Sequence, residues 1–205
     1  MAKHTTFQQI RDLPFTHQAL LACYLSARMK PNYDIFHVAT GFGDPKVLQG
    51  VLDVVWHWLG HAGKAGFSRW QEKVDEVTPS EHTHDMLGVF PAMEACVAIS
   101  TLLQGLIDKD PKPLLDVAKV SQGSVAHFIE LTEGADLEPE ARAQLLREHD
   151  LALYEIEVQQ AMVSFLAEHA DVDAALVKAV REQVQLEGMS HLGFSIPELP
   201  ADTAE

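Results

Sequence analysis

The chain has 205 residues, of which 47% are hydrophobic and 22% are charged, a composition typical of one soluble globular domain or of two small ones. It carries 15 Lys and Arg residues against 30 Asp and Glu residues, so its formal net charge is −15 at neutral pH. Because a surface with this charge repels phosphate groups, we expect no nucleic-acid partner.

The spacing of apolar residues predicts an all-α fold, because it follows steps of three and four residues and shows no sustained alternation of apolar and polar residues. We expect residues 1–15 to be an N-terminal leader, 16–194 a single helical domain and 195–205 a flexible tail. The domain is predicted to be a compact up-down or orthogonal bundle of about seven to eight helices. In chain order, the predicted helices are 16–29, 33–40, 45–59, 68–77, 90–107, 114–132, 139–169 and 171–187.

Capping residues and prolines set the predicted boundaries. Thr16 caps the first helix, and Pro31 is expected to end it, since proline disfavours helical backbone at the preceding residue. Asp44 followed by Pro45 is a strong start signal, because the carboxylate accepts free backbone amides and proline fits the first helical position. Gly188 is expected to stop the last helix.

The acidic charge is concentrated in the second part of the chain. Residues 1–80 hold 8 basic and 7 acidic side chains, whereas residues 81–205 hold 7 basic and 23 acidic ones. Nine of these acids fall between Glu130 and Glu157. A solvated helix face that keeps the protein soluble explains the pattern, and a docking surface for a basic protein is the alternative.

The sequence favours a cytoplasmic protein. Residues 1–15 lack the apolar stretch of a signal peptide, and Cys23 and Cys96 lie in apolar helical patterns that predict reduced core thiols. Residues 86–107 are apolar but contain Glu94, and a central charge costs roughly 2.5–3.5 kcal/mol in a membrane. We therefore interpret this segment as a core helix and expect no membrane partner.

Two stretches carry specific motifs. The first reads Arg28-Met29-x-Pro31-Asn32-Tyr33-x-x-Phe36, then Thr40-Gly41-Phe42-Gly43-Asp44 and Leu52-Asp53-x-x-Trp56; the second reads Gly88-Val89-x-Pro91-Ala92-x-x-Ala95-Cys96-Val97-Ala98-x-Ser100. Through these motifs, and from about Thr16 to Phe194, the chain resembles the YjaG-like bacterial family, domain of unknown function 416. The resemblance implies a compact helical domain without established activity, cofactor or substrate, and it supplies no catalytic residues. Histidine enrichment between Trp56 and His84 departs from the family pattern.

The polar residues of the first motif are candidates for ligand binding. Arg28, with the backbone amides exposed after Gly43, is suited to hold a small anion or a peptide terminus, and Asn32, Tyr33 and Asp44 complete the candidate set. Capping and turn formation are the alternative role of these side chains.

Histidines form a candidate metal site. His57 and His61 are four residues apart on one predicted helix face, a spacing that lets two imidazoles reach one ion. A complete site would need further ligands, for which His82, His84, Asp85 and Glu81 are the candidates. Surface histidines near a helix end are the alternative.

No catalytic motif is present. Glu94 lies among apolar residues, where burial would raise the pKa of its carboxyl toward a range useful in acid–base catalysis, and Glu155 and Glu157 are similar. A structural role is the alternative for all three.

The leading hypothesis is a non-enzymatic protein-interaction domain, a homodimer that uses an apolar surface containing Trp58 or Trp70 and needs no cofactor. A divalent-metal-dependent binding or hydrolytic protein is the alternative.

Overall fold

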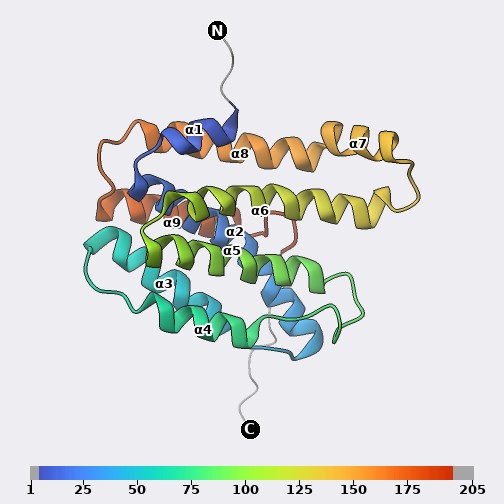
Figure 1. Cartoon of the computed structure of the whole chain (residues 1–205), viewed down its shortest axis with the longest axis horizontal. Helices are drawn as coiled ribbons and strands as arrows, with labels where there is room; N and C mark the ends of the chain where they lie inside the picture. Colours follow the sequence, from blue (N-terminus) through green and yellow to red (C-terminus); the bar gives the residue numbers. More distant parts are fainter. Residues whose placement is uncertain (1–4, 196–205) are drawn as a thin grey trace.

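The computed structural model describes residues 5–195, which contain nine α-helices and one short π-helix (Figure 1). In chain order these are α1 (Thr6–Asp12), α2 (Phe15–Thr40), α3 (Pro45–His61), α4 (Phe67–Val77), α5 (Val89–Asp108), α6 (Pro111–Ile129), the π-helix η1 (Glu130–Gly134), α7 (Pro139–Glu148), α8 (Asp150–Ala167) and α9 (Ala174–Glu187). Between residues 5 and 195 there is no β-strand, only a bridge between Met189 and Ser195. The all-α prediction is confirmed, with nine helices in the described residues instead of seven to eight.

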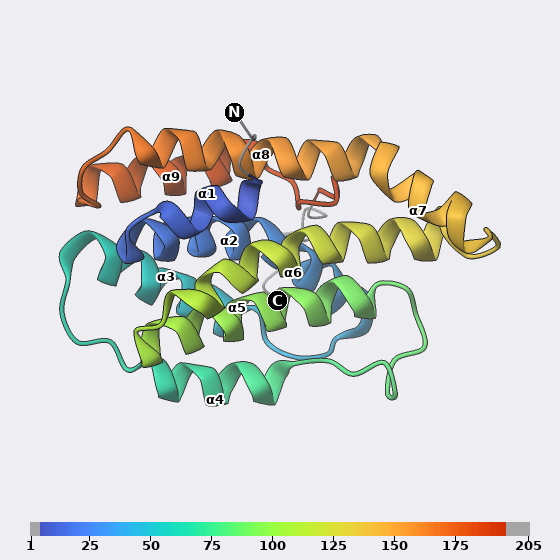
Figure 2. The ribbon, with the colours of Figure 1, turned by 45° about the horizontal axis from the view of Figure 1, so that its top comes forward.

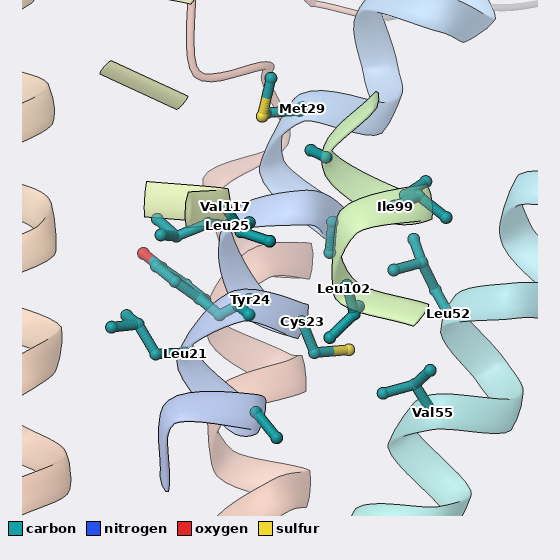
Figure 3. Close-up of a cluster of buried hydrophobic side chains, with 14 of the residues drawn as sticks. Leu21, Cys23, Tyr24, Leu25, Met29, Leu52, Val55, Ile99, Leu102 and Val117 are labelled. Atoms are coloured by element: carbon teal, nitrogen blue, oxygen red, sulfur yellow. The ribbon is translucent and has the colours of Figure 1, made fainter. Parts of the chain in front are cut away.

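Helices α2 and α5 form the centre of the bundle. In Figure 2, α8 and α9 lie along one side and α4 along the opposite side, with α2 and α5 between them. Every residue of α2 from His17 to Met29 is buried, as expected for a helix enclosed by others. Figure 3 shows side chains of α2, α3 and α5 meeting around Cys23. Burying one such aliphatic side chain stabilises the fold by about 1.5–3 kcal/mol.

Among residues 5–195, α5 is the one helix whose length and composition would allow it to cross a membrane. A core helix meets the same criteria. Here 56% of its most apolar stretch of 18 residues is buried, and the helix packs against α2, α4 and α6. This packing is that of a central core helix.

The prediction that Pro31 ends the first helix is wrong. Helix α2 continues to Thr40, so the predicted helices 16–29 and 33–40 are one. An internal proline costs about 3 kcal/mol, because it removes one backbone hydrogen bond and crowds the preceding turn. Burial on both sides of the proline, including Met29, Tyr33 and Phe36, offsets this cost.

The single helix predicted over 139–169 is also wrong, because the structure breaks it at His149. This residue has extended backbone (φ −69°, ψ 129°), and its Nδ1 accepts a hydrogen bond from the backbone amide of Leu151 at 3.1 Å. His149 is thus the cap of α8, although histidine is not among the residues that usually cap a helix.

The remaining boundaries follow capping chemistry. The start at Asp44 and Pro45 is confirmed, and Asp110 followed by Pro111 opens α6 in the same way, three residues before the predicted start. Residues predicted as a leader contain α1, whose Ile10 is fully buried. Of the predicted tail, residues 196–205 lie outside the described residues.

A buried ion network and an apolar groove as the candidate functional site

A buried arginine lies between three helices. The Arg28 side chain extends from α2, and its Nη1 donates to Glu155 Oε2 of α8 at 2.7 Å. Its Nε donates to Glu187 Oε2 of α9 at 2.9 Å. Arg28 is 2% exposed and Glu155 fully buried, whereas the Glu187 side chain keeps 19% of its surface exposed. The network therefore reaches solvent through Glu187.

Neutral side chains complete the hydrogen bonding of Glu155. Its Oε1 accepts from Ser121 Oγ at 2.6 Å and from Gln159 Nε2 at 2.9 Å, and Gln159 is itself held by Gln122 at 2.8 Å. Both carboxylate oxygens of Glu155 thus have donors. A buried ion pair satisfied in this way fixes how helices pack, but its net contribution to stability is small, because desolvation offsets the attraction.

The electrostatics of the network keep Arg28 charged. Burial by itself lowers the pKa of Arg28, but the carboxylates of Glu155 and Glu187 outweigh it and raise the pKa above its usual value. Burial also raises the pKa of Tyr24, whose hydroxyl donates to Glu187 Oε1 at 2.8 Å. One cation therefore faces two carboxylates, and Glu187 carries the surplus negative charge toward the surface.

The turn after α9 extends this polar region along α2. The backbone amide of His191 donates to the carbonyl of Arg28 at 3.0 Å, and the Asn32 amide Nδ2 meets His191 Nδ1 at 3.2 Å. Burial lowers the pKa of His191 to about 4, so the imidazole is neutral at pH 7.

This burial predicts an acid-sensitive fold. The unfolded chain protonates His191 near its ordinary pKa of about 6.5, whereas the folded chain does so only near 4. The neutral imidazole therefore stabilises the fold fully above pH 6.5, and this contribution, roughly 3 kcal/mol, is lost as the pH falls from 6.5 to 4. The free energy of unfolding in urea, measured across this pH range, should change less with pH for His191→Gln than for wild type. Equal slopes in the two proteins would contradict the assignment.

Beside the network, an apolar groove of about 450 Å³ lies between α8 and α9. Helix α8 packs on α1, α2, α6 and α7, and α9 packs on α2 and α3, whereas α8 and α9 contact each other little. Tyr24 and Glu187 line the groove together with apolar side chains of both helices, namely Tyr154, Val158, Ala161, Met162, Phe165, Ala179 and Val180. The buried network and the groove therefore share two residues.

The structure brings two of the four ligand-binding candidates together. Arg28 and Asn32 lie one turn apart on α2, and both contact residues at the end of α9 or in the turn after it. The charge of Arg28 is matched internally, so its guanidinium does not face solvent where an anion would bind. Asp44 caps α3 by accepting from the amide of Lys46 at 2.9 Å.

Tyr33 holds the loop before α3. Its hydroxyl donates to the carbonyl of Val77 at 2.8 Å, and Gly43, which has a φ of 75°, packs directly on that hydroxyl. A Cβ at Gly43 would lie 1.9 Å from Tyr33 Oη. Glycine is therefore required at position 43, because the backbone has a positive φ and because a side chain there would overlap the Tyr33 hydroxyl.

The histidines predicted as metal ligands are dispersed. The rings of His57 and His61 lie 4.8 Å apart on α3, but His82 is in an exposed turn and His84 packs against the rings of Phe36 and Phe42. No group of three or more His, Cys, Asp or Glu side chains in residues 5–195 is placed to hold a metal ion. Metal binding at His57 and His61 stays a prediction.

Glu94 joins a small cluster at the surface of α5 and α6. Its carboxylate accepts from Ser124 Oγ at 2.5 Å and contacts His127 Nδ1 at 2.7 Å. The serine hydroxyl and the imidazole bind different oxygens of this carboxylate, so the three side chains are joined through Glu94.

Both cysteines are buried and free. Burial raises the pKa of the Cys96 thiol to about 12 and also raises that of Cys23, so neither forms a thiolate at neutral pH.

Two network members were not predicted from the sequence. Glu187 is the last residue of the predicted helix 171–187, and His191 lies beyond it, where no element was predicted. Glu155 was singled out only as a carboxylate among apolar residues, which is the signal that a buried ion pair leaves in a sequence.

The sequence and the fold of the chain are similar to those of known proteins. The family description "Protein of unknown function (DUF416)" matches residues 5–195. The "Uncharacterized protein YjaG" of Escherichia coli is 33% identical over 181 residues, which cover 87% of this chain and 89% of that protein, and its Salmonella typhimurium counterpart is 30% identical. The crystal structure of a DUF416 family protein from Shewanella baltica superposes with a TM-score of 0.89 at 32% identity, covering 95% of this chain and all of that one.

Proposed function

This chain belongs to the DUF416 family of proteins of unknown function, and we propose that it is a protein-interaction domain whose docking surface is the groove between α8 and α9. The partner is an amphipathic helix with basic residues beside its apolar face. The observation that carries the proposal is an apolar groove between two helices that pack on the bundle and contact each other little.

Exposed apolar side chains support docking at this groove. Tyr154 is 52% exposed and Phe165 is 39% exposed, although both belong to the groove wall. Leu186, which lies three residues after the wall residue Gln183 on α9, is 82% exposed. Large exposed apolar side chains beside a groove mark interaction surfaces more often than scattered single ones do.

The charge around the groove supports a basic partner. Asp150 and Glu157 are exposed and lie four residues before and three residues after Tyr154, so they border the wall residues of α8. Glu187 lies in the groove itself. Lysines beside the apolar face of a partner helix would face these carboxylates, and the helix would fill the groove with side chains at i, i+3, i+4 and i+7.

The test is binding of two synthetic helices of about 15 residues that share one leucine face and carry either lysine or glutamate elsewhere. We expect the lysine helix to bind about tenfold more tightly in fluorescence anisotropy, and salt to remove most of the difference. Tyr154→Asp should weaken this binding about tenfold, whereas Leu137→Asp, at an exposed position outside the groove, should not change it. Equal binding of the two helices, or equal effects of the two variants, would refute the proposal.

Self-association is a second candidate function, and it uses a different face. Trp58 and Trp70 line a hollow of about 610 Å³ between α3 and α4. Trp58 packs edge-on against Phe67, with ring centroids 5.7 Å apart, and Trp70 has Lys73 over its ring. Residues 1–80 are nearly neutral, so two copies would meet at this face without the repulsion expected between two acidic halves. Sedimentation should give a dimer for wild type and a monomer for Trp70→Glu, and a monomeric wild type would end this candidate.

A further inference from the structure

A second cavity, separate from the α8–α9 groove, lies beside α2 where α5 begins. It has a volume of about 200 Å³ and is walled by Ile35, Phe36, Ala39, Met86, Leu87, Pro91, Phe128 and Phe194 together with Gly88. Met86, Leu87 and Phe194 are 39–53% exposed and form its mouth. The rings of Phe128 and Phe194 meet edge to face at 5.4 Å.

Asn32 is the single polar side chain among the residues that line this cavity. It is 4% exposed, and its Nδ2 is used by His191, but its Oδ1 has no hydrogen-bond partner. A buried acceptor without a donor costs about 1–3 kcal/mol. A bound group that donates one hydrogen bond would remove this cost.

Water fits this position poorly. A buried water makes about three hydrogen bonds to polar groups of its site, and the other side chains of the wall are apolar. A charged ligand also fits poorly, because the wall offers no opposite charge and desolvation would not be compensated. A neutral molecule with one donor and a flat apolar body matches the wall.

We propose that this cavity binds a small, neutral, mainly aromatic molecule that donates one hydrogen bond to Asn32 Oδ1. The rings of Phe36, Phe128 and Phe194 contact its apolar body. Oδ1 is itself buried, so ligand binding requires a small turn of the amide about its broad terminal torsion, one that brings Oδ1 to the cavity surface and keeps Nδ2 bonded to His191 Nδ1. The proposal is independent of the helix-docking groove, since the two sites share no residue.

Indole and indene test this assignment, because they have the same size and shape but only indole carries an N–H donor. Titration calorimetry with the full chain should show indole binding about fivefold more tightly than indene. The protein variant Asn32→Leu should make the two affinities equal by weakening indole binding alone. This ratio does not depend on the stability of the variant, so it separates a ligand contact from a structural role of Asn32.

A second pair of variants places the probe in this cavity. Ala39 lines the cavity and is exposed, so Ala39→Trp should block the mouth and abolish binding of both probes. Val38→Trp changes the neighbouring exposed residue, which is not part of the wall, and should leave binding intact. The proposal is overturned if neither probe binds wild type at millimolar concentration, if both bind equally, or if Ala39→Trp binds like Val38→Trp.

Discussion

Arg28→Met is expected to destabilise the fold by about 3–5 kcal/mol. Methionine keeps much of the apolar stem but leaves Glu155 fully buried without its cation, and breaking one side of a buried ion pair has this cost. The measurement is the free energy of unfolding in urea at pH 7.

Two further variants separate charge imbalance from lost packing. Glu187→Gln should cost less than Arg28→Met, because Glu187 is partly exposed and Arg28 keeps Glu155. The double variant Arg28→Met/Glu155→Gln should be more stable than Arg28→Met alone, since no buried carboxylate remains without a cation. A loss below about 1 kcal/mol for Arg28→Met would show that the buried pair does not organise the three helices.

Gly43→Ala is expected to cost about 2–5 kcal/mol, in two parts. A left-handed backbone at a non-glycine residue costs roughly 1–2 kcal/mol, and overpacking in a filled site adds about 1–3 kcal/mol. The added Cβ would overlap the Tyr33 hydroxyl, which cannot move away without losing its bond to the carbonyl of Val77.

Gly41→Ala is the matched control. Gly41 has a similar φ of 71°, but nothing lies within 4 Å of an added Cβ, so only the backbone part of the cost should appear. Adding Tyr33→Phe to Gly43→Ala should recover part of the second loss, because it removes the overlapping oxygen. Equal destabilisation by the two alanine variants in urea unfolding would disprove the contact.

Local signals in the sequence were sufficient for much of the fold. Asp44 and Pro45 start α3 as predicted, because this capping chemistry acts within four residues. Pro31 shows where local reasoning fails: the preference against proline in a helix is weaker than the burial of α2 on both sides, and that burial depends on helices distant in sequence.

The candidate site was less predictable than the fold, for the same reason. The first motif identified Arg28 and Asn32, but their partners Glu155, Glu187 and His191 lie 127 to 159 residues further along the chain. No spacing rule connects residues at that separation. The groove was not predicted either. Its walls come from α8 and α9, and their relative position is set by the other helices on which each of them packs.

The pairing of Arg28 with α8 and α9 has a consequence for synthesis. The ribosome makes Arg28 early, but its two counter-charges follow only at positions 155 and 187, near the end of the chain. Until then the arginine must stay hydrated, because an unpaired cation does not enter a protein interior. A nascent chain that stops before α9 therefore lacks the second carboxylate and the turn whose His191 bonds to α2.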